Sequence, residues 1–256
     1  MMLSDKIIVL MPVRQAAEFL NETFECLYQL DPQPDLYIFG ENNSTDDTLE
    51  IISKFDGSKK IIRLWFRDDV LDYCETRFDI LGIIRQFLLQ AARHLDPDFI
   101  IFLDSDIRVR SPDLITRLTR WREQADIIGG PYLRYTPLGL RVAAIWPGWW
   151  HRPNRTSAVT LEDVMVVGGG CMRLPRKVLQ DRRLNFYPVK HENLALENEL
   201  FRREASTLGF PPRLGDLAED IAYCLEAWYL GYSIGLDWTI LLDHWIDGQN
   251  QTLAIE

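Results

Sequence analysis

Two carboxylates that are one residue apart follow an apolar stretch near the middle of the chain. The stretch Phe99–Leu103 leads directly to Asp104, Ser105 and Asp106. In an extended backbone, residues i and i+2 point to the same side, so both carboxylates can reach one divalent ion, or an ion and a ribose. Hard oxygen ligands suit Mg²⁺ or Mn²⁺. The pattern predicts a metal-assisted site at the end of a strand, and a turn with two solvated acids is the alternative.

A third acid, Glu41, ends another apolar stretch. An acidic side chain at the carboxyl end of a strand can accept hydrogen bonds from a nucleotide base or ribose. The polar residues that follow, Asn43–Asp47, favour a turn with a helix cap. Glu41 is therefore the functional candidate of this segment.

Two further acids, Glu219 and Asp220, begin a segment whose apolar residues have helical spacing. A carboxylate in this place can remove a proton from an acceptor hydroxyl. The alternative is a pair of first-turn acids that stabilise the helix macrodipole.

The sequence also predicts alternating strands and helices, which would position these acids. Short β-branched apolar runs alternate with amphipathic segments through the first hundred residues, which predicts βαβ units and a parallel sheet. Ligands of such sheets bind at the carboxyl ends of the strands. The expected strands are Lys6–Met11, Asp35–Gly40, Ile61–Phe66 and Phe99–Asp104, and the expected helices are Ala16–Leu30, Asp46–Phe55 and Thr76–Leu95.

The second part of the chain is less regular. Proline, glycine and aromatic residues over Tyr132–Asn154 predict a loop. We find no repeat or linker, so we expect one domain over residues 1–256. The remaining expected elements are helices over Pro112–Trp121 and Asp220–Leu230, and strands over Asp126–Gly129, Val164–Leu174 (through a glycine turn) and near Tyr232–Leu236.

Charge and cysteine content exclude several classes of protein. Lys and Arg number 28 and Asp and Glu number 38, a net charge of −10 that disfavours a nucleic-acid partner. A nucleotide is still allowed, because a metal ion can neutralise its phosphates. The four cysteines lack zinc-ligand or CxxC spacing, which favours reduced thiols in a reducing compartment. No apolar run is long enough for a transmembrane segment or a signal peptide, so we expect a cytoplasmic protein.

The order and spacing of these motifs resemble the GT-A-fold glycosyltransferases, especially the inverting enzymes similar to family 2. Residues 40–48 (GENNSTDDT) are similar to their DDGSTDDT signature, Asp104–Asp106 to their DxD motif, and Glu219–Asp220 to their ED helix. Pro12-Val13-Arg14 and Gly168–Met172 also stand in the expected order. The resemblance implies a GT-A fold, which is a single Rossmann-like α/β domain with a mostly parallel central sheet flanked by helices.

Such enzymes transfer a sugar from a nucleotide diphosphate-sugar, here a UDP- or GDP-sugar, to a hydroxyl of a glycan, polysaccharide or glycolipid, with Mn²⁺ or Mg²⁺ as cofactor. The resemblance implies Asp220 as the catalytic base. Aromatic faces stack on sugar rings, and glycine permits close backbone approach. Carried over residue by residue, the donor would contact Pro12, Arg14, Glu41, Asp104 and Ser105, and the metal would contact Asp104, Asp106 and His244. By their own chemistry, Arg85 is a further candidate for the donor diphosphate, and Trp149, Trp150, Gly169 and Glu219 are candidates for the acceptor.

The resemblance extends over residues 6–244. It implies a nucleotide-binding half of about residues 1–106 and an acceptor-binding half of about residues 107–256. A lipid-linked acceptor would add peripheral contact with the inner face of a membrane to the cytoplasmic location.

Three alternatives stay open. Arg77 and Arg85 also fit relatives that build mannans with retention of configuration, so Asp220 favours inversion without proving it. Haloacid-dehalogenase-like phosphatases have a strand that ends in DxD, but Arg108 stands where they need Thr or Val. A domain that binds nucleotide-sugar or glycan without turnover is the third, and the acids at every expected position argue against it.

Overall fold

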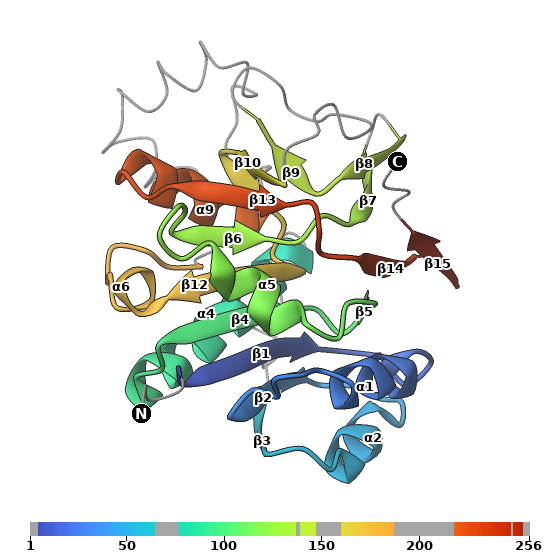
Figure 1. The fold of residues 1–256 in the computed structure, drawn as a ribbon. Helices are drawn as coiled ribbons and strands as arrows, with labels where there is room; N and C mark the ends of the chain where they lie inside the picture. Colours follow the sequence, from blue (N-terminus) through green and yellow to red (C-terminus); the bar gives the residue numbers. More distant parts are fainter. Residues whose placement is uncertain are drawn as a thin grey trace.

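The computed structural model describes residues 5–64, 77–136, 139–146, 160–186, 218–246 and 248–252. An eight-stranded sheet forms the centre of the molecule (Figure 1). In spatial order its strands are β10 (Leu161–Asp163), β13 (Ile234–Asp237), β6 (Ile127–Gly129), β12 (Cys171–Pro175), β4 (Phe99–Leu103), β1 (Ile7–Val13), β2 (Leu36–Asn42) and β3 (Lys59–Leu64).

Most of these strands run in one direction. β1, β2, β3 and β4 pair in parallel. β12 is antiparallel to both of its neighbours, β4 and β6, so β6 has the direction of β4, and β13 is parallel to β6. β10 is antiparallel to β13. The mostly parallel α/β sheet expected from the alternating pattern is confirmed.

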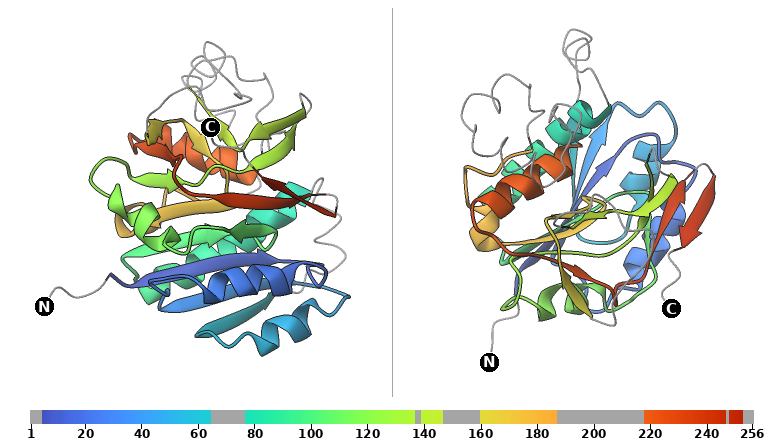
Figure 2. Two further views of the ribbon diagram at one scale, coloured as in Figure 1. Left: turned by 45° about the vertical axis from the view of Figure 1, so that its right-hand side comes forward. Right: turned by 90° about the horizontal axis from the view of Figure 1, so that it is seen from above.

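Helices cover both faces of the sheet (Figure 2). Along β4, Ile100 and Phe102 belong to one apolar core, whereas Phe99, Ile101 and Leu103 belong to the other, as the two-residue period of a strand requires. One face packs against α4 (Arg77–Leu95), α6 (Arg176–Leu179) and α9 (Glu219–Tyr229), and the other against α1 (Leu20–Tyr28), α2 (Thr48–Lys54) and α5 (Leu114–Arg120).

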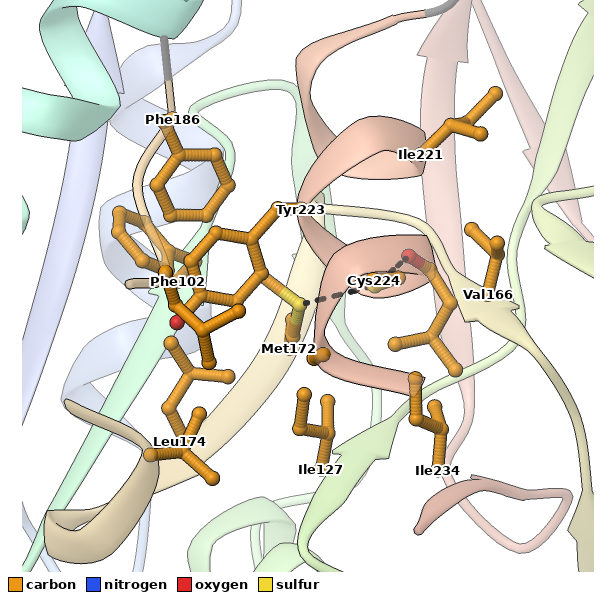
Figure 3. Close-up of a cluster of buried hydrophobic side chains, with 14 of the residues drawn as sticks. Phe102, Ile127, Val166, Met172, Leu174, Phe186, Ile221, Tyr223, Cys224 and Ile234 are labelled. Atoms are coloured by element: carbon orange, nitrogen blue, oxygen red, sulfur yellow. Dashed lines mark hydrogen bonds between the residues drawn. The ribbon is translucent and has the colours of Figure 1, made fainter. Parts of the chain in front are cut away.

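Aromatic packing fixes α9 on the sheet (Figure 3). The Tyr223 ring stacks on Phe186 with centroids 4.2 Å apart, and Phe186 meets Phe102 of β4 edge-on at 5.1 Å. The Cys224 thiol lies 3.5 Å from the Val167 carbonyl oxygen. Each fully buried side chain of this size contributes about 1.5–3 kcal/mol. The first turn of α9 is therefore held beside the carboxyl end of β4.

Three smaller sheets lie beside the central one. Two of them include residues from the segment Tyr132–Asn154, where the predicted loop is wrong for the described part. Proline and glycine disfavour strands locally, but pairing with neighbouring strands overrides that preference. The small sheets are β5 (Ile107–Val109) with β14 (Leu242–Ile246) and β15 (Gln249–Thr252), β7 (Leu133–Thr136) with β8 (Gly139–Val142), and β9 (Ala144–Ile145) with β11 (Val166–Val167).

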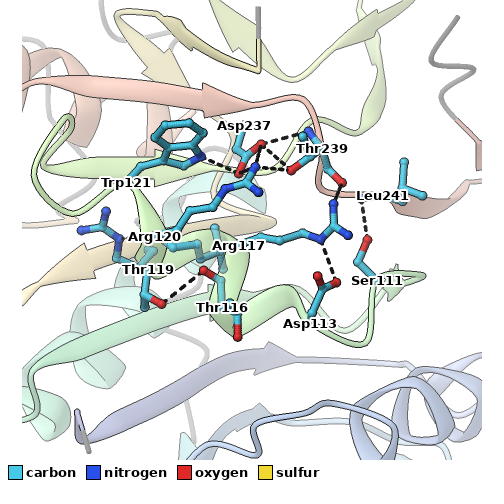
Figure 4. A network of polar contacts seen from close by, with 12 residues as sticks. Ser111, Asp113, Thr116, Arg117, Thr119, Arg120, Trp121, Asp237, Thr239 and Leu241 are labelled. Atoms are coloured by element: carbon cyan, nitrogen blue, oxygen red, sulfur yellow. Dashed lines mark hydrogen bonds and ion pairs between the residues drawn. The ribbon is translucent and has the colours of Figure 1, made fainter. Parts of the chain in front are cut away.

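A polar network fixes the connection between β13 and β14 (Figure 4). The fully buried carboxylate of Asp237 accepts hydrogen bonds from Arg120, Trp121 and Thr239. Arg117 bonds to Asp113 and to the Thr239 carbonyl oxygen. The path of the chain from the central sheet into β14 is thus attached to α5.

None of the helices in the described ranges is long and apolar enough to cross a membrane. Cys26, Cys171 and Cys224, the cysteines within the described ranges, are free thiols.

Candidate active site

The candidate acids meet at the carboxyl edge of the sheet. Asp104 follows directly after β4, and Glu41 lies near the end of β2, paired with Val13. Cys171 of β12 pairs with Leu103, which brings the turn Gly168–Gly170 beside Asp104. The Asp104 amide donates to the Gly170 carbonyl oxygen at 3.0 Å. This edge is where open α/β sheets bind their ligands.

Arg85 crosses from α4 into this edge and is almost completely buried, with 1% of its surface exposed. Its Nη2 lies 2.7 and 2.9 Å from the two carboxylate oxygens of Asp104. Its Nε donates to Glu219 at 3.0 Å and its Nη1 to the Gly169 carbonyl oxygen at 2.9 Å. Burial acts to lower the pKa of Arg85, but the charges of Asp104 and Glu219 raise it above its ordinary value, so the guanidinium stays charged.

Asp220 lies at the start of α9, beside the glycine turn. Its Oδ2 accepts the Gly169 N–H at 2.8 Å, and its Oδ1 accepts the Ile221 N–H at 2.8 Å. These bonds orient the carboxylate, and each oxygen keeps a second lone pair. Asp104 experiences the charge of Asp220, which contributes to raising the pKa of Asp104 after the larger effect of burial.

Glu219, the neighbour of Asp220, is buried. Burial, followed by the charge of Asp220, raises the pKa of Glu219 to about 8, although Arg85 opposes the shift. Its Oε2 has no hydrogen-bond partner among the described residues. The raised pKa favours the protonated form of Glu219 at neutral pH.

Asp106 and His244 meet because β5 pairs with β14. The register places His244 opposite Ile107, the residue after Asp106. His244 Nε2 lies 3.4 Å from Asp106 Oδ2, and Nδ1 lies 2.6 Å from the Leu133 carbonyl oxygen. Burial lowers the pKa of His244, but the hydrogen bond and charge of Asp106 raise it overall. His244 lies within β14, a strand that the sequence analysis did not predict.

Asp106 and His244 are the residues that could hold a divalent cation, which would take the place of the Nε2 proton. With Nδ1–H donated to the Leu133 carbonyl, the Nε2 lone pair of the deprotonated ring would be available to the ion. The described residues contain no group of three or more acids, histidines or cysteines that could hold a metal. Two protein ligands, with diphosphate oxygens completing the shell, match the way Mg²⁺ binds. The oxygens of Asp104, also a predicted ligand, are bonded to Arg85 instead.

The residues predicted to contact the nucleotide lie at the ends of β1 and β2. Pro12 is buried within β1, and Arg14 is exposed just after it. The Glu41 carboxylate is 1% exposed, accepts the Ser44 N–H at 2.7 Å and lies 3.3 Å from Arg63 Nε. Glu41 therefore closes its own turn and has only a small surface for a ligand.

Ser105 is buried between the two acids of the DxD motif. Its carbonyl oxygen accepts the Thr23 hydroxyl at 2.8 Å, which attaches the motif to α1. Trp149 and Trp150, the predicted acceptor contacts, lie outside the described residues.

The sequence analysis missed Tyr132. Its hydroxyl accepts the Gly170 N–H at 3.0 Å, and its ring packs edge-on against His244 at 5.3 Å between centroids. A Cβ at Gly168 or Gly170 would lie within 3 Å of the tyrosine. A Cβ at Gly169 would instead lie 2.8 Å from Arg85 Cζ. The run of three glycines was the available signal, because it marks a backbone that side chains approach closely.

No protein-family model matches the sequence, and no curated protein does. Solved structures share the fold. The chain superposes on TarS of S. aureus with a TM-score of 0.55 at 17% identity, over 91% of this chain and 35% of TarS. TarS 1-349 in complex with UDP-GlcNAc gives a TM-score of 0.57 at 17% identity, over 90% of this chain and 55% of that one.

The mannosyltransferase PcManGT from Pyrobaculum calidifontis, in complex with GDP-Man and Mn²⁺, gives a TM-score of 0.51 at 13% identity, over 92% of this chain and 57% of PcManGT. The chain spans 35% to 57% of the length of these three neighbours. At such identities the likeness establishes the fold alone. The chain has the fold of glycosyltransferases solved with nucleotide-sugars.

Proposed function

We propose that the protein is a metal-dependent glycosyltransferase that moves a sugar from a nucleotide diphosphate-sugar to a hydroxyl of a glycan or lipid-linked sugar. The observation that carries the proposal is the gathering of Asp220, the Asp104–Arg85 pair and the Asp106–His244 pair at one edge of the sheet. The neighbours solved with UDP-GlcNAc and with GDP-Man and Mn²⁺ support UDP- or GDP-sugars as the donor class.

In the proposed reaction Asp220 is the general base. A free lone pair of its carboxylate takes the proton of the acceptor hydroxyl, while the hydroxyl oxygen forms a bond to the anomeric carbon. The bond from that carbon to the diphosphate oxygen breaks, and its electron pair leaves with the diphosphate. Attack opposite to the leaving group inverts the configuration.

Asp106 and His244 would hold the metal ion, which when bound neutralises the charge that develops on the departing diphosphate. Asp106 supplies a carboxylate oxygen and His244 its Nε2, with Nδ1–H fixed by the Leu133 carbonyl. Because burial and hydrogen bonds preorganise these groups, they need little rearrangement during the reaction.

A phosphatase is the alternative from another class, and the surroundings of Asp104 disfavour it. A nucleophilic aspartate needs an electron-rich carboxylate oxygen, and a bonded cation withdraws electron density from it. Both oxygens of Asp104 are within hydrogen-bond distance of a buried guanidinium instead.

A thermal-shift panel with UDP, GDP, CMP and dTDP, each with and without Mn²⁺, tests the proposal. A ligand that binds only the folded state raises the melting temperature. We expect UDP or GDP to raise it, and to do so more strongly with Mn²⁺. Release of nucleoside diphosphate from UDP-GlcNAc or GDP-Man should then follow, with monosaccharides and methyl glycosides as trial acceptors. No shift with any nucleotide, together with phosphate release from an aryl phosphate, would favour the phosphatase.

Proton nuclear magnetic resonance of the product decides between inversion and retention. A product that keeps the anomeric configuration of the donor would favour the retaining, mannosyltransferase-like alternative.

A further inference from the structure

The guanidinium of Arg85 contacts two acids of the site, Asp104 and Glu219, at the same time. This group forms an ion pair with Asp104 on one side and donates a hydrogen bond to Glu219 on the other. The carboxylate of Asp104 thus already neutralises the cation. A side chain that is 1% exposed and bonded in this way is poorly placed to bind a diphosphate, which was the role expected from the sequence.

Arg85 is connected to Asp220 by two routes. In the first, Arg85 Nη1 donates to the carbonyl of Gly169, and the N–H of the same residue donates to Asp220 Oδ2. In the second, Arg85 Nε bonds to Glu219, which directly precedes Asp220 at the start of α9. Any displacement of the guanidinium therefore moves the carboxylate that acts as base.

We propose that Arg85 and Glu219 are positioning residues that hold Asp104, on the donor side, and Asp220, on the acceptor side, in one rigid frame. The inference rests on the proposed function. It assigns to Arg85 no contact with substrate: the guanidinium acts through Asp104, Gly169 and Asp220.

The charge of the cluster supports this arrangement. One guanidinium faces Asp104, Glu219 and Asp220, and three anions beside one cation at a largely buried site would carry a large desolvation cost. A protonated Glu219 removes one of these charges. Its Oε1 would still accept the Arg85 Nε–H, and Oε2, which has no partner among the described residues, would carry the proton.

Arg85→Lys is the main test. Lysine keeps the charge but lacks the planar fork that reaches three partners. We expect kcat for nucleoside diphosphate release from UDP-GlcNAc or GDP-Man to fall about 100-fold, the size of effect that a misplacement of about 1 Å produces. The donor KM and the Kd for UDP or GDP with Mn²⁺ should change less than threefold.

Arg93→Lys is the matched control. Arg93 lies on the same helix, is also buried, and donates to the carbonyl oxygens of Leu179, Asp181 and Leu184, away from the acids. The Arg93→Lys substitution should lower the melting temperature. Its kcat, measured at a temperature at which the variant is folded, should stay unchanged.

Glu219 supplies a second test that does not depend on how Arg85→Lys folds. Gln keeps the acceptor that Arg85 needs and resembles the neutral acid, whereas Ala removes it. We expect Glu219→Gln to have at least a tenfold higher kcat than Glu219→Ala. In the protein without ligand or metal at pH 7, the infrared spectrum should contain a protonated-carboxyl band that Glu219→Gln removes.

The outcomes separate the two proposals. If the wild-type protein releases no nucleotide from either donor, the proposed function fails and the inference falls with it. If the wild-type protein is active and Arg85→Lys raises the donor Kd tenfold or more at unchanged kcat, Arg85 binds the diphosphate and the inference alone is overturned. Equal kcat values for Glu219→Gln and Glu219→Ala would overturn it as well.

Discussion

Asp220 is the residue on which the proposed chemistry depends most. Asp220→Asn keeps the size of the side chain and an oxygen that can accept the Gly169 N–H, but it cannot take a proton. Because general-base catalysis contributes roughly 10²–10⁴-fold, we expect kcat to fall by that factor. The donor Kd, measured by calorimetry, should stay unchanged.

Glu50→Gln is a suitable control for this variant. Glu50 is an exposed acid in the first turn of α2, where it pairs with Lys54. The Glu50→Gln variant should have wild-type kcat. A fully active Asp220→Asn would contradict the role of base.

The pair formed by Asp106 and His244 leads to a prediction about the metal. His244→Gln removes the Nε2 ligand, so the effect of Mn²⁺ on the Kd of UDP or GDP should fall at least tenfold. Binding without metal should be unaffected. His94→Gln, at an exposed position on α4, is the control. An unaltered Mn²⁺ effect in His244→Gln would show that the metal binds elsewhere.

At the scale of elements, the glycine turn before β12 controls the site. Gly169→Ala would place a Cβ 2.8 Å from the Arg85 guanidinium carbon and displace it. We expect kcat to fall about 100-fold. Gly235→Ala places its Cβ at the same 2.8 Å, but from the side chain of Leu161. If both variants lose stability and only Gly169→Ala loses kcat, the effect belongs to the position and not to crowding in general.

Elements with strong local patterns were predictable, and elements that depend on distant partners were not. The run Phe99–Leu103 predicts β4 because five consecutive buried apolar residues suit a strand that is covered on both faces. The segment Leu133–Ile145 has no such pattern, and its strands form only through pairing. β14 likewise depends on β5, more than 130 residues earlier.

The same distinction holds within the site. The acids of the DxD and ED motifs stand out in the sequence. The partners of Arg85 could not be predicted. Helical spacing indicates which side of α4 is apolar, but it does not indicate which carboxylates of other elements contact that helix. Tyr132 was missed because its role depends on contacts with a turn about 40 residues later, such as its bond to Gly170.

At the scale of the whole molecule, the buried acid Glu219 makes stability depend on pH. Its pKa is about 8 in the folded protein, with Arg85, Asp104 and Asp220 as the charged groups that face it, against 4.5 ordinarily. The folded state therefore binds more protons than the unfolded state between these values. Its contribution to the unfolding free energy is full below about pH 4.5 and is lost as pH rises towards 8, by at most about 1.4 kcal/mol per pH unit.

Urea unfolding of the wild-type protein and Glu219→Gln at several pH values checks this. The difference in unfolding free energy between the two proteins should change with pH over this range, in favour of Gln at high pH. A constant difference would mean that Glu219 is ionised in the folded protein.

The small sheet of β5 and β14 has a consequence for insertions and deletions. Successive side chains of a strand alternate between faces, so a shift of one residue in β14 would turn His244 away from Asp106 and bring a neighbour into its place. The connection Trp238–Leu241 sets that register. Because Arg117 of α5 bonds to the Thr239 carbonyl oxygen, the connection cannot change length without moving β14. An insertion or deletion in this connection should therefore separate His244 from Asp106 even where the core around Trp238 and Ile240 is kept.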